Sequence, residues 1–128
     1  MKALFLKGNV FSGKGEGARF IELSWVREQI EEKLGFAPFL GTLNIRLVGE
    51  SIKLRQMLEK ASGIEIMPRE GFGRGNCFKA FIKGLECAVV IPKIADYPEN
   101  ILEIIASMNL RERFKLKDGD IVEVKVFF

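Results

Sequence analysis

Hydrophobic and polar residues alternate along several short stretches of this chain, with the period of two that indicates β-strands. The alternation is clearest near the C-terminal end, where every second residue from Val122 to Val126 is a valine. Residues 101–107 also fit a helix, but their isoleucines favour a strand. We therefore predict strands over residues 2–11, 19–23, 42–48, 64–67, 77–82, 85–91, 101–107 and 121–128.

Hydrophobic residues at a spacing of four, which places them on one helix face, predict two helices over residues 25–34 and 52–61. Val26, Ile30 and Leu34 form the predicted buried stripe of the first helix. The predicted end residues are Ser24 and Gly35 for the first helix, Ser51 and Gly63 for the second, and Asn109 before a short helical turn over residues 110–114.

Lys83 and Gly84 separate two β runs and predict a tight hairpin. The run that follows, residues 85–91, is almost entirely apolar, which favours a central strand that ends at Pro92. Strands do not alternate regularly with helices along the chain. We therefore expect a mainly β fold, a small and mostly antiparallel closed barrel with two or three short helices outside it.

The length of 128 residues favours one domain over residues 1–128, and the apolar content of 48% is ordinary for a globular protein. A net charge of +3 suits an anionic ligand but is too small to argue for nucleic acid. Cys77 and Cys87 lack zinc-site spacing and are expected to be buried thiols in a reducing compartment. With no signal peptide or long apolar run, we expect a cytoplasmic protein without membrane contact.

The chain contains no histidine. This excludes a Ser-His-Asp triad, a Cys-His nucleophile pair, a histidine base and histidine metal ligands together. Carboxylates, lysines, cysteines and one tyrosine remain as acid–base groups. Any chemistry is therefore expected to depend on positioning, charge and a metal ion.

Two short motifs carry the candidate chemistry. Residues 13–18, Gly-Lys-Gly-Glu-Gly-Ala, form a glycine loop that can direct several backbone N–H groups at one anion. With a strand predicted next at 19–23, the helix that a dinucleotide fingerprint requires is absent, and a plain hairpin turn is the alternative interpretation. Thr42 and Asn44 share one face of a predicted strand, where their oxygens can hold Mg²⁺ or simply face solvent.

Residues 69–76 contain two arginines and three glycines. This composition fits a loop that closes over a ligand, but a mobile connection is the favoured interpretation.

Four segments together resemble the archaeal CTP-dependent riboflavin kinase family, in order and over nearly the whole chain. They are residues 7–20 around the glycine loop, 39–47 with Gly-Thr-Leu-Asn, 89–93 together with 103–112, and Leu-Lys-Asp-Gly-Asp at 116–120. The resemblance implies a six-stranded cradle-loop barrel. It also implies transfer of the γ-phosphate of CTP to the 5′-hydroxyl of riboflavin, which gives FMN and CDP.

The resemblance also implies roles for individual residues. Nucleotide phosphates would lie on Gly13, Lys14, Gly15, Glu16, Gly17 and Ala18, and the cytosine nucleotide beside Met108, Asn109, Leu110 and Arg111. Thr42 and Asn44 would hold Mg²⁺, while Ala95 and Glu103 would contact the flavin. Glu103 is also the candidate to accept or orient the riboflavin hydroxyl, and a monomer is expected.

The chain departs from the family pattern at three positions. Ala18 replaces a common arginine, Ala95 an expected hydroxyl residue, and Tyr97 a frequent histidine. Two alternative functions stay open at this point. One is a non-catalytic barrel that binds a nucleotide or flavin, and the other is a nucleic-acid-binding barrel.

Overall fold

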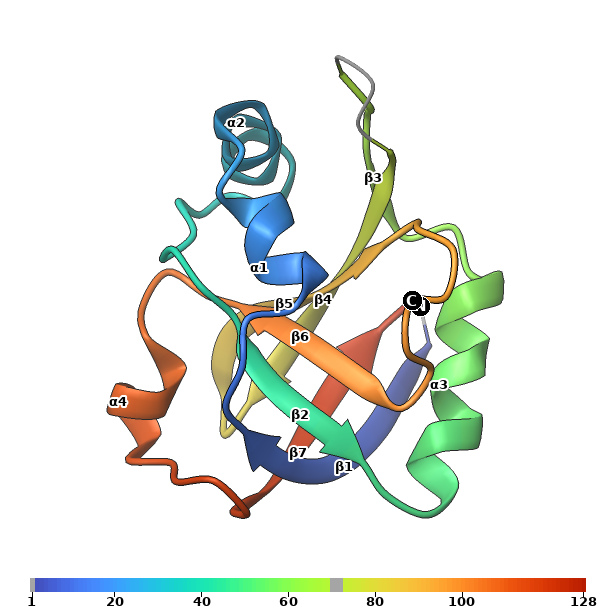
Figure 1. Ribbon diagram of the computed structural model, residues 1–128, viewed down its shortest axis with the longest axis vertical. Helices are drawn as coiled ribbons and strands as arrows, with labels where there is room; N and C mark the ends of the chain where they lie inside the picture. Colours follow the sequence, from blue (N-terminus) through green and yellow to red (C-terminus); the bar gives the residue numbers. More distant parts are fainter. Residues whose placement is uncertain (1, 70–72) are drawn as a thin grey trace.

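The computed structural model describes residues 2–69 and 73–128. Within them the chain forms seven strands and four helices (Figure 1). In chain order these are β1 (Ala3–Phe11), α1 (Glu16–Ile21), α2 (Ser24–Leu34), β2 (Leu43–Leu47), α3 (Glu50–Lys60), β3 (Ile64–Ile66), β4 (Gly75–Ile82), β5 (Leu85–Pro92), β6 (Ile101–Ile105), α4 (Leu110–Phe114) and β7 (Ile121–Phe127). No helix of these described residues is long and apolar enough to cross a membrane.

Six of the strands close into an antiparallel barrel, in the order β4-β5-β6-β2-β1-β7. The barrel closes where β7 returns to β4, through the pairs Ala80–Val126 and Phe81–Lys125. Strand β3 extends the sheet beyond β4, outside this closed ring. The predicted closed barrel is confirmed, with four short helices around it in place of two or three.

The barrel has two apolar layers. Alternate residues of β5 explain both, because Cys87 and Val89 point into the barrel interior while Ala88 and Val90 point outward. The outward layer is covered by α1 and α2, which lie together over one side of the barrel in Figure 1. Strand β5 is therefore buried on both faces, which accounts for its continuous apolar sequence.

Helix α3 packs on the opposite side of the barrel, against β1 (Figure 1), and the first and last described residues, Lys2 and Phe128, lie beside each other. Backbone hydrogen bonds of 2.9 Å join Lys2 and Phe128 in both directions.

The strand predicted over residues 19–23 is wrong, because Glu16–Ile21 is helical. Its buried residues include Gly17, Phe20 and Ile21, which share one helix face, but a segment this short fits either period. A helix therefore begins inside the predicted glycine loop, at Glu16, so that Gly17 and Ala18 are helical. The neighbouring described strands are antiparallel, so the parallel unit of a dinucleotide-binding fold is not formed by them.

The predicted helix ends are partly confirmed. Gly35 ends α2 in the left-handed conformation with φ 86°, and Asn109 accepts a hydrogen bond from the Glu112 N–H at 3.3 Å. The serines are not N-caps, since Leu23 and Gly49 occupy those positions. Helix α3 ends at Lys60 rather than at the predicted Gly63. Of the loop predicted to close over a ligand, residues 70–72 lie outside the described residues.

Candidate active site

Glu103 lies at the centre of the candidate site. It is in the middle of β6, where its neighbours Leu102 and Ile104 point into the barrel interior and Glu103 points outward. Helix α1 and the glycine loop cover it, so that only 1% of Glu103 is exposed. A carboxylate so deeply buried requires hydrogen-bond partners.

Four donors satisfy this carboxylate. The N–H groups of Gly17 and Ala18 donate to it at 2.7 and 3.3 Å, and the Thr42 hydroxyl donates at 3.3 Å. The Tyr97 hydroxyl makes the fourth bond. The first two donors belong to the first turn of α1, whose N–H groups have no partner within the helix. Glu103 therefore supplies the anion that stabilises the start of α1.

The close approach of Glu103 explains two of the glycines in the loop. A Cβ at Gly15 would lie 2.5 Å from one carboxylate oxygen, and a Cβ at Gly17 would lie 2.6 Å from the other. From the sequence, these glycines were expected to let an anion such as a nucleotide phosphate approach the backbone. In this structure the anion that approaches the backbone is the Glu103 carboxylate.

Thr42 and Asn44 come together as the sequence predicts. The single proton of the Thr42 hydroxyl is shared between Glu103 and Asn44 Oδ1, which lies 2.9 Å from Thr42 Oγ1, and Asn44 Nδ2 donates to the carbonyl of Gly13 at 2.7 Å. Asn44 of β2 also pairs directly with Glu103 of β6 in the sheet. Three side-chain oxygens therefore gather on one face of two neighbouring strands, from Thr42, Asn44 and Glu103.

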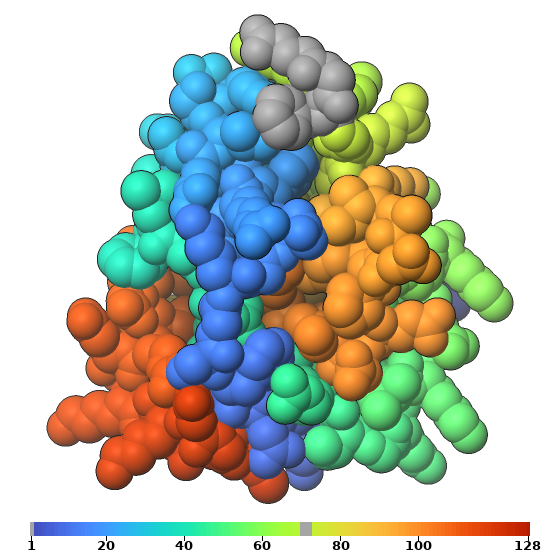
Figure 2. Space-filling model, viewed as in Figure 1, coloured from blue at the N-terminus to red at the C-terminus, as the bar shows by residue number. Residues whose placement is uncertain are grey.

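Two cavities flank these three residues. The larger, about 410 Å³, is lined by the first four loop residues, Asn44 and Glu103, and by Ala95 and Tyr97 on its other wall. The smaller, about 200 Å³, is lined by Thr42 and by all four residues from 108 to 111. Figure 2 shows the glycine loop running down the face of the molecule with a hollow on each side.

The structure divides the predicted nucleotide residues between the two cavities. Gly13, Lys14, Gly15 and Glu16 line the larger one, whereas Met108, Asn109, Leu110 and Arg111 line the smaller one. Gly17 and Ala18 are buried behind the loop and bind Glu103. The predicted flavin residues, Ala95 and Glu103, share the larger cavity.

A polar cluster connects the two halves of the site. Arg111 donates to the Ser12 hydroxyl at 3.1 Å and to Asp118 at 2.9 Å, and Ser12 donates to Asp118 at 2.8 Å. The hydrogen bond from Ser12, followed by that from Arg111, lowers the pKa of Asp118. The cluster ties the start of the glycine loop to the turn before β7, and it fixes one end of Arg111.

Two further cations near the glycine loop, Lys14 and Arg19, have carboxylate partners. Lys14 forms an ion pair with Glu22, and Arg19 lies 3.4 Å from Glu16. Both pairs are largely exposed, so each contributes little to stability and leaves its cation available to an anionic ligand.

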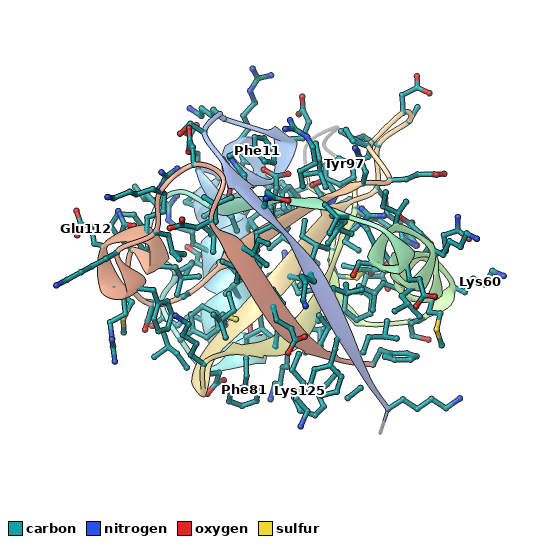
Figure 3. All side chains as sticks on the ribbon, turned by 90° about the horizontal axis from the view of Figure 1, so that it is seen from below. Phe11, Lys60, Phe81, Tyr97, Glu112 and Lys125 are labelled. Atoms are coloured by element: carbon teal, nitrogen blue, oxygen red, sulfur yellow. The ribbon has the colours of Figure 1, made fainter. Side chains whose placement is uncertain are left out.

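Tyr97 is the main site residue whose contacts sequence reasoning missed. Burial, followed by the charge of Glu103, raises the pKa of the Tyr97 hydroxyl above its usual range, so the hydroxyl stays a proton donor at neutral pH. Figure 3 shows Tyr97 and Phe11 at the same edge of the barrel, where both line the larger cavity. The only signal in the sequence was its replacement of a histidine frequent in the family pattern.

Ser12, Asp118 and Arg55 were also missed. Ser12 and Asp118 lie inside two segments that carry the family resemblance. Only analogy with the family could therefore have indicated that the two side chains meet. Arg55, which is 1% exposed and lies 5.8 Å from the Tyr97 ring centre, has no local signal because it belongs to an ordinary amphipathic helix.

Comparisons with known proteins agree with the resemblance. A family model named CTP-dependent riboflavin kinase, described as "Domain of unknown function DUF120", matches residues 10–126. A protein named riboflavin kinase from Archaeoglobus fulgidus is 47% identical over an alignment 128 residues long. The alignment includes 94% of this chain and 54% of that protein. A protein of the same name from Pyrobaculum aerophilum is 48% identical, and the alignment includes 94% of this chain and 60% of that protein. The chain thus spans little more than half the length of these curated relatives.

Proposed function

The chain belongs to the CTP-dependent riboflavin kinase family, and from that premise we propose that it transfers the γ-phosphate of CTP to the 5′-hydroxyl of riboflavin, giving FMN and CDP. One observation carries the proposal. Thr42, Asn44 and Glu103 meet at the boundary of two cavities, so a group bound in one cavity can reach a group bound in the other.

The smaller cavity supports the donor side of this proposal. It is bordered by residues 108–111, which the family pattern assigns to the nucleotide. Arg111, held by Ser12 and Asp118, provides a positive charge beside both this cavity and the start of the glycine loop. We assign the cytosine nucleotide to this side, with its phosphates directed toward the loop and toward Thr42.

The larger cavity supports the acceptor side. Its volume of about 410 Å³ falls within the range of pockets that enclose small organic ligands, and its walls include the aromatic rings of Phe11 and Tyr97. We assign the flavin ring system to these walls, with the ribityl chain directed toward Glu103. In that position Glu103 is the group that orients the attacking hydroxyl and accepts its proton.

The side chains at the boundary fit Mg²⁺. Thr42 Oγ1 and Asn44 Oδ1 are neutral oxygen ligands 2.9 Å apart, with a Glu103 oxygen 3.3 Å from the threonine hydroxyl. We propose that Thr42 and Asn44 hold the ion. When bound, Mg²⁺ would neutralise phosphate charge during transfer. The chain itself would fix the line of attack, through the loop on one side and Glu103 on the other.

The first test is a turnover assay. Purified protein is incubated with riboflavin and Mg²⁺, with CTP, ATP, GTP and UTP in separate reactions, and FMN is followed by chromatography. FMN formed chiefly with CTP is the expected result. Equal rates with ATP would contradict the assigned donor, whereas no FMN with any donor would favour the non-catalytic or nucleic-acid-binding alternatives.

The second test concerns the metal residues. Thr42→Ala and Asn44→Ala should each lower kcat by at least about a hundredfold, because each removes one oxygen ligand. Thr42→Ser retains the hydroxyl and is the matched control, with activity expected near that of the unmodified chain. Circular dichroism checks that each variant is folded. Full activity in either alanine variant would refute the metal assignment.

A further inference from the structure

Glu103 occupies donors that the proposed function needs elsewhere. The N–H groups of Gly17 and Ala18 belong to the loop assigned to the nucleotide phosphates, yet both donate to Glu103 in this structure. A phosphate that takes these two donors must displace the carboxylate from them. The displaced carboxylate is buried, and the Thr42 hydroxyl that also reaches it lies closer to Asn44, so the carboxylate needs a further fixed donor or its charge is left poorly compensated.

Tyr97 is placed to be that donor. Its hydroxyl binds the same carboxylate oxygen, Oε2, as the Gly17 N–H, but it approaches from the wall of the larger cavity. The hydroxyl is therefore on the acceptor side of the site, whereas the two N–H groups lie in the first turn of α1.

Tyr97 is itself held in place from behind. The Arg55 guanidinium lies 5.8 Å from the centre of the Tyr97 ring. Arg55 is fixed by hydrogen bonds of 3.0 Å to the Ile101 carbonyl and 2.7 Å to Glu59. Ile101 is the first residue of β6, two positions before Glu103, so one buried arginine supports both the ring and the strand that carries the carboxylate.

We propose that Tyr97 is a positioning residue, which retains the Glu103 carboxylate on the acceptor side when nucleotide phosphate takes the N–H groups of Gly17 and Ala18. The inference rests on the proposed function and deepens it. Nucleotide binding then moves Glu103 from the loop toward the riboflavin hydroxyl. The carboxylate becomes available to the acceptor only when the donor is in place.

The proposal predicts opposite changes in nucleotide affinity for two variants. Glu103→Gln replaces the charged competitor with a neutral side chain of the same size, so CDP and CTP should bind about tenfold more tightly. Tyr97→Phe removes the donor on which the displaced carboxylate depends, so the same nucleotides should bind about tenfold more weakly. A purely structural role for Tyr97 would not produce this difference in sign.

Affinity is measured by isothermal titration calorimetry with Mg²⁺ and without riboflavin, and FMN formation is measured in parallel. Glu99→Gln is the matched control, because Glu99 is an exposed carboxylate in the same loop as Tyr97. The control should change neither quantity. Tyr97→Phe should also lower kcat for FMN, since Glu103 is then less often directed at the acceptor.

A second measurement avoids the risk that a variant does not fold. Tyr97 is the single tyrosine of the chain, so isotope-labelled tyrosine gives one assigned NMR signal. Saturating CDP should shift this signal in the unmodified protein, and the shift should be largely lost in Glu103→Gln. An unchanged signal at saturation would contradict the proposal.

The outcomes distinguish a failure of the role proposed for Tyr97 from a failure of the proposed kinase function. Protein that forms FMN, while both variants shift affinity in the same direction or not at all, would overturn the role of Tyr97 and leave the proposed function intact. Protein that binds no nucleotide would overturn both. Opposite affinity shifts without FMN formation would support the competition between Glu103 and phosphate but overturn the kinase.

Discussion

The contact between Gly17 and Glu103 allows a sharp test by substitution. In the folded chain, a Cβ at Gly17 would lie 2.6 Å from Oε2 and 2.7 Å from Cδ of Glu103. In the protein without nucleotide, four hydrogen bonds hold the carboxylate in this position. Gly17→Ala should therefore destabilise the protein, although alanine is the better helix former.

The magnitude follows from two opposing effects. Forcing one extra carbon into a packed site costs about 1–3 kcal/mol, and replacing glycine with alanine in a helix returns about 0.5–1 kcal/mol. The net loss for Gly17→Ala should be about 1.5 kcal/mol. With an unfolding entropy of about 2.1 cal/mol/K per residue over 128 residues, this lowers Tm by about 5 °C.

The same substitution in a Glu103→Ala background provides the control. Removing the carboxylate opens the space beside Gly17, so only the gain in helix propensity remains. Gly17→Ala should then stabilise the protein by about 0.5–1 kcal/mol. The background variant is itself less stable, because two N–H groups of α1 lose their partner, so each comparison is made within its own background.

The free energy of unfolding is measured by urea denaturation with circular dichroism for all four proteins of this cycle. The expected coupling between the two positions is about 2–3 kcal/mol. If Gly17→Ala changes stability equally in both backgrounds, within about 0.5 kcal/mol, then the carboxylate does not explain why this position is glycine.

Three further predictions follow from other parts of the structure. The hydrogen bond from Ser12 lowers the pKa of Asp118, so Asp118→Asn should reduce stability at neutral pH, and this difference should disappear as pH falls through that lowered pKa in thermal unfolding series. Burial raises the pKa of Cys77 and of Cys87 to about 12, so iodoacetamide at pH 8 should label neither thiol in the folded protein, and both after unfolding; mass spectrometry would reveal any native labelling. Gly63 has φ 61°, and a Cβ there would lie 2.8 Å from a phenylalanine ring atom, so Gly63→Ala should cost about 2 kcal/mol in urea unfolding; no loss would contradict the described packing.

The candidate site was predictable in its parts but not in its arrangement. The spacing of Thr42 and Asn44 correctly indicated a shared face, and residues 101–105 form the strand that the isoleucines favoured. Their proximity to each other depends on the register that pairs Asn44 with Glu103 across β2 and β6. Local sequence carries no information on that register, because the two residues are far apart in the chain.

The sequence by itself determined seven of the eight predicted strands, the hairpin at Lys83 and Gly84, and the caps at Gly35 and Asn109, because each depends on neighbouring residues alone. Only the tertiary structure decided that residues 16–21 are a helix. Its first N–H groups are satisfied by Glu103, 86 residues after Gly17, and its apolar face is completed by β5. Closure of the barrel likewise depended on distant residues, since a strand edge is satisfied only by the partner that folding brings to it.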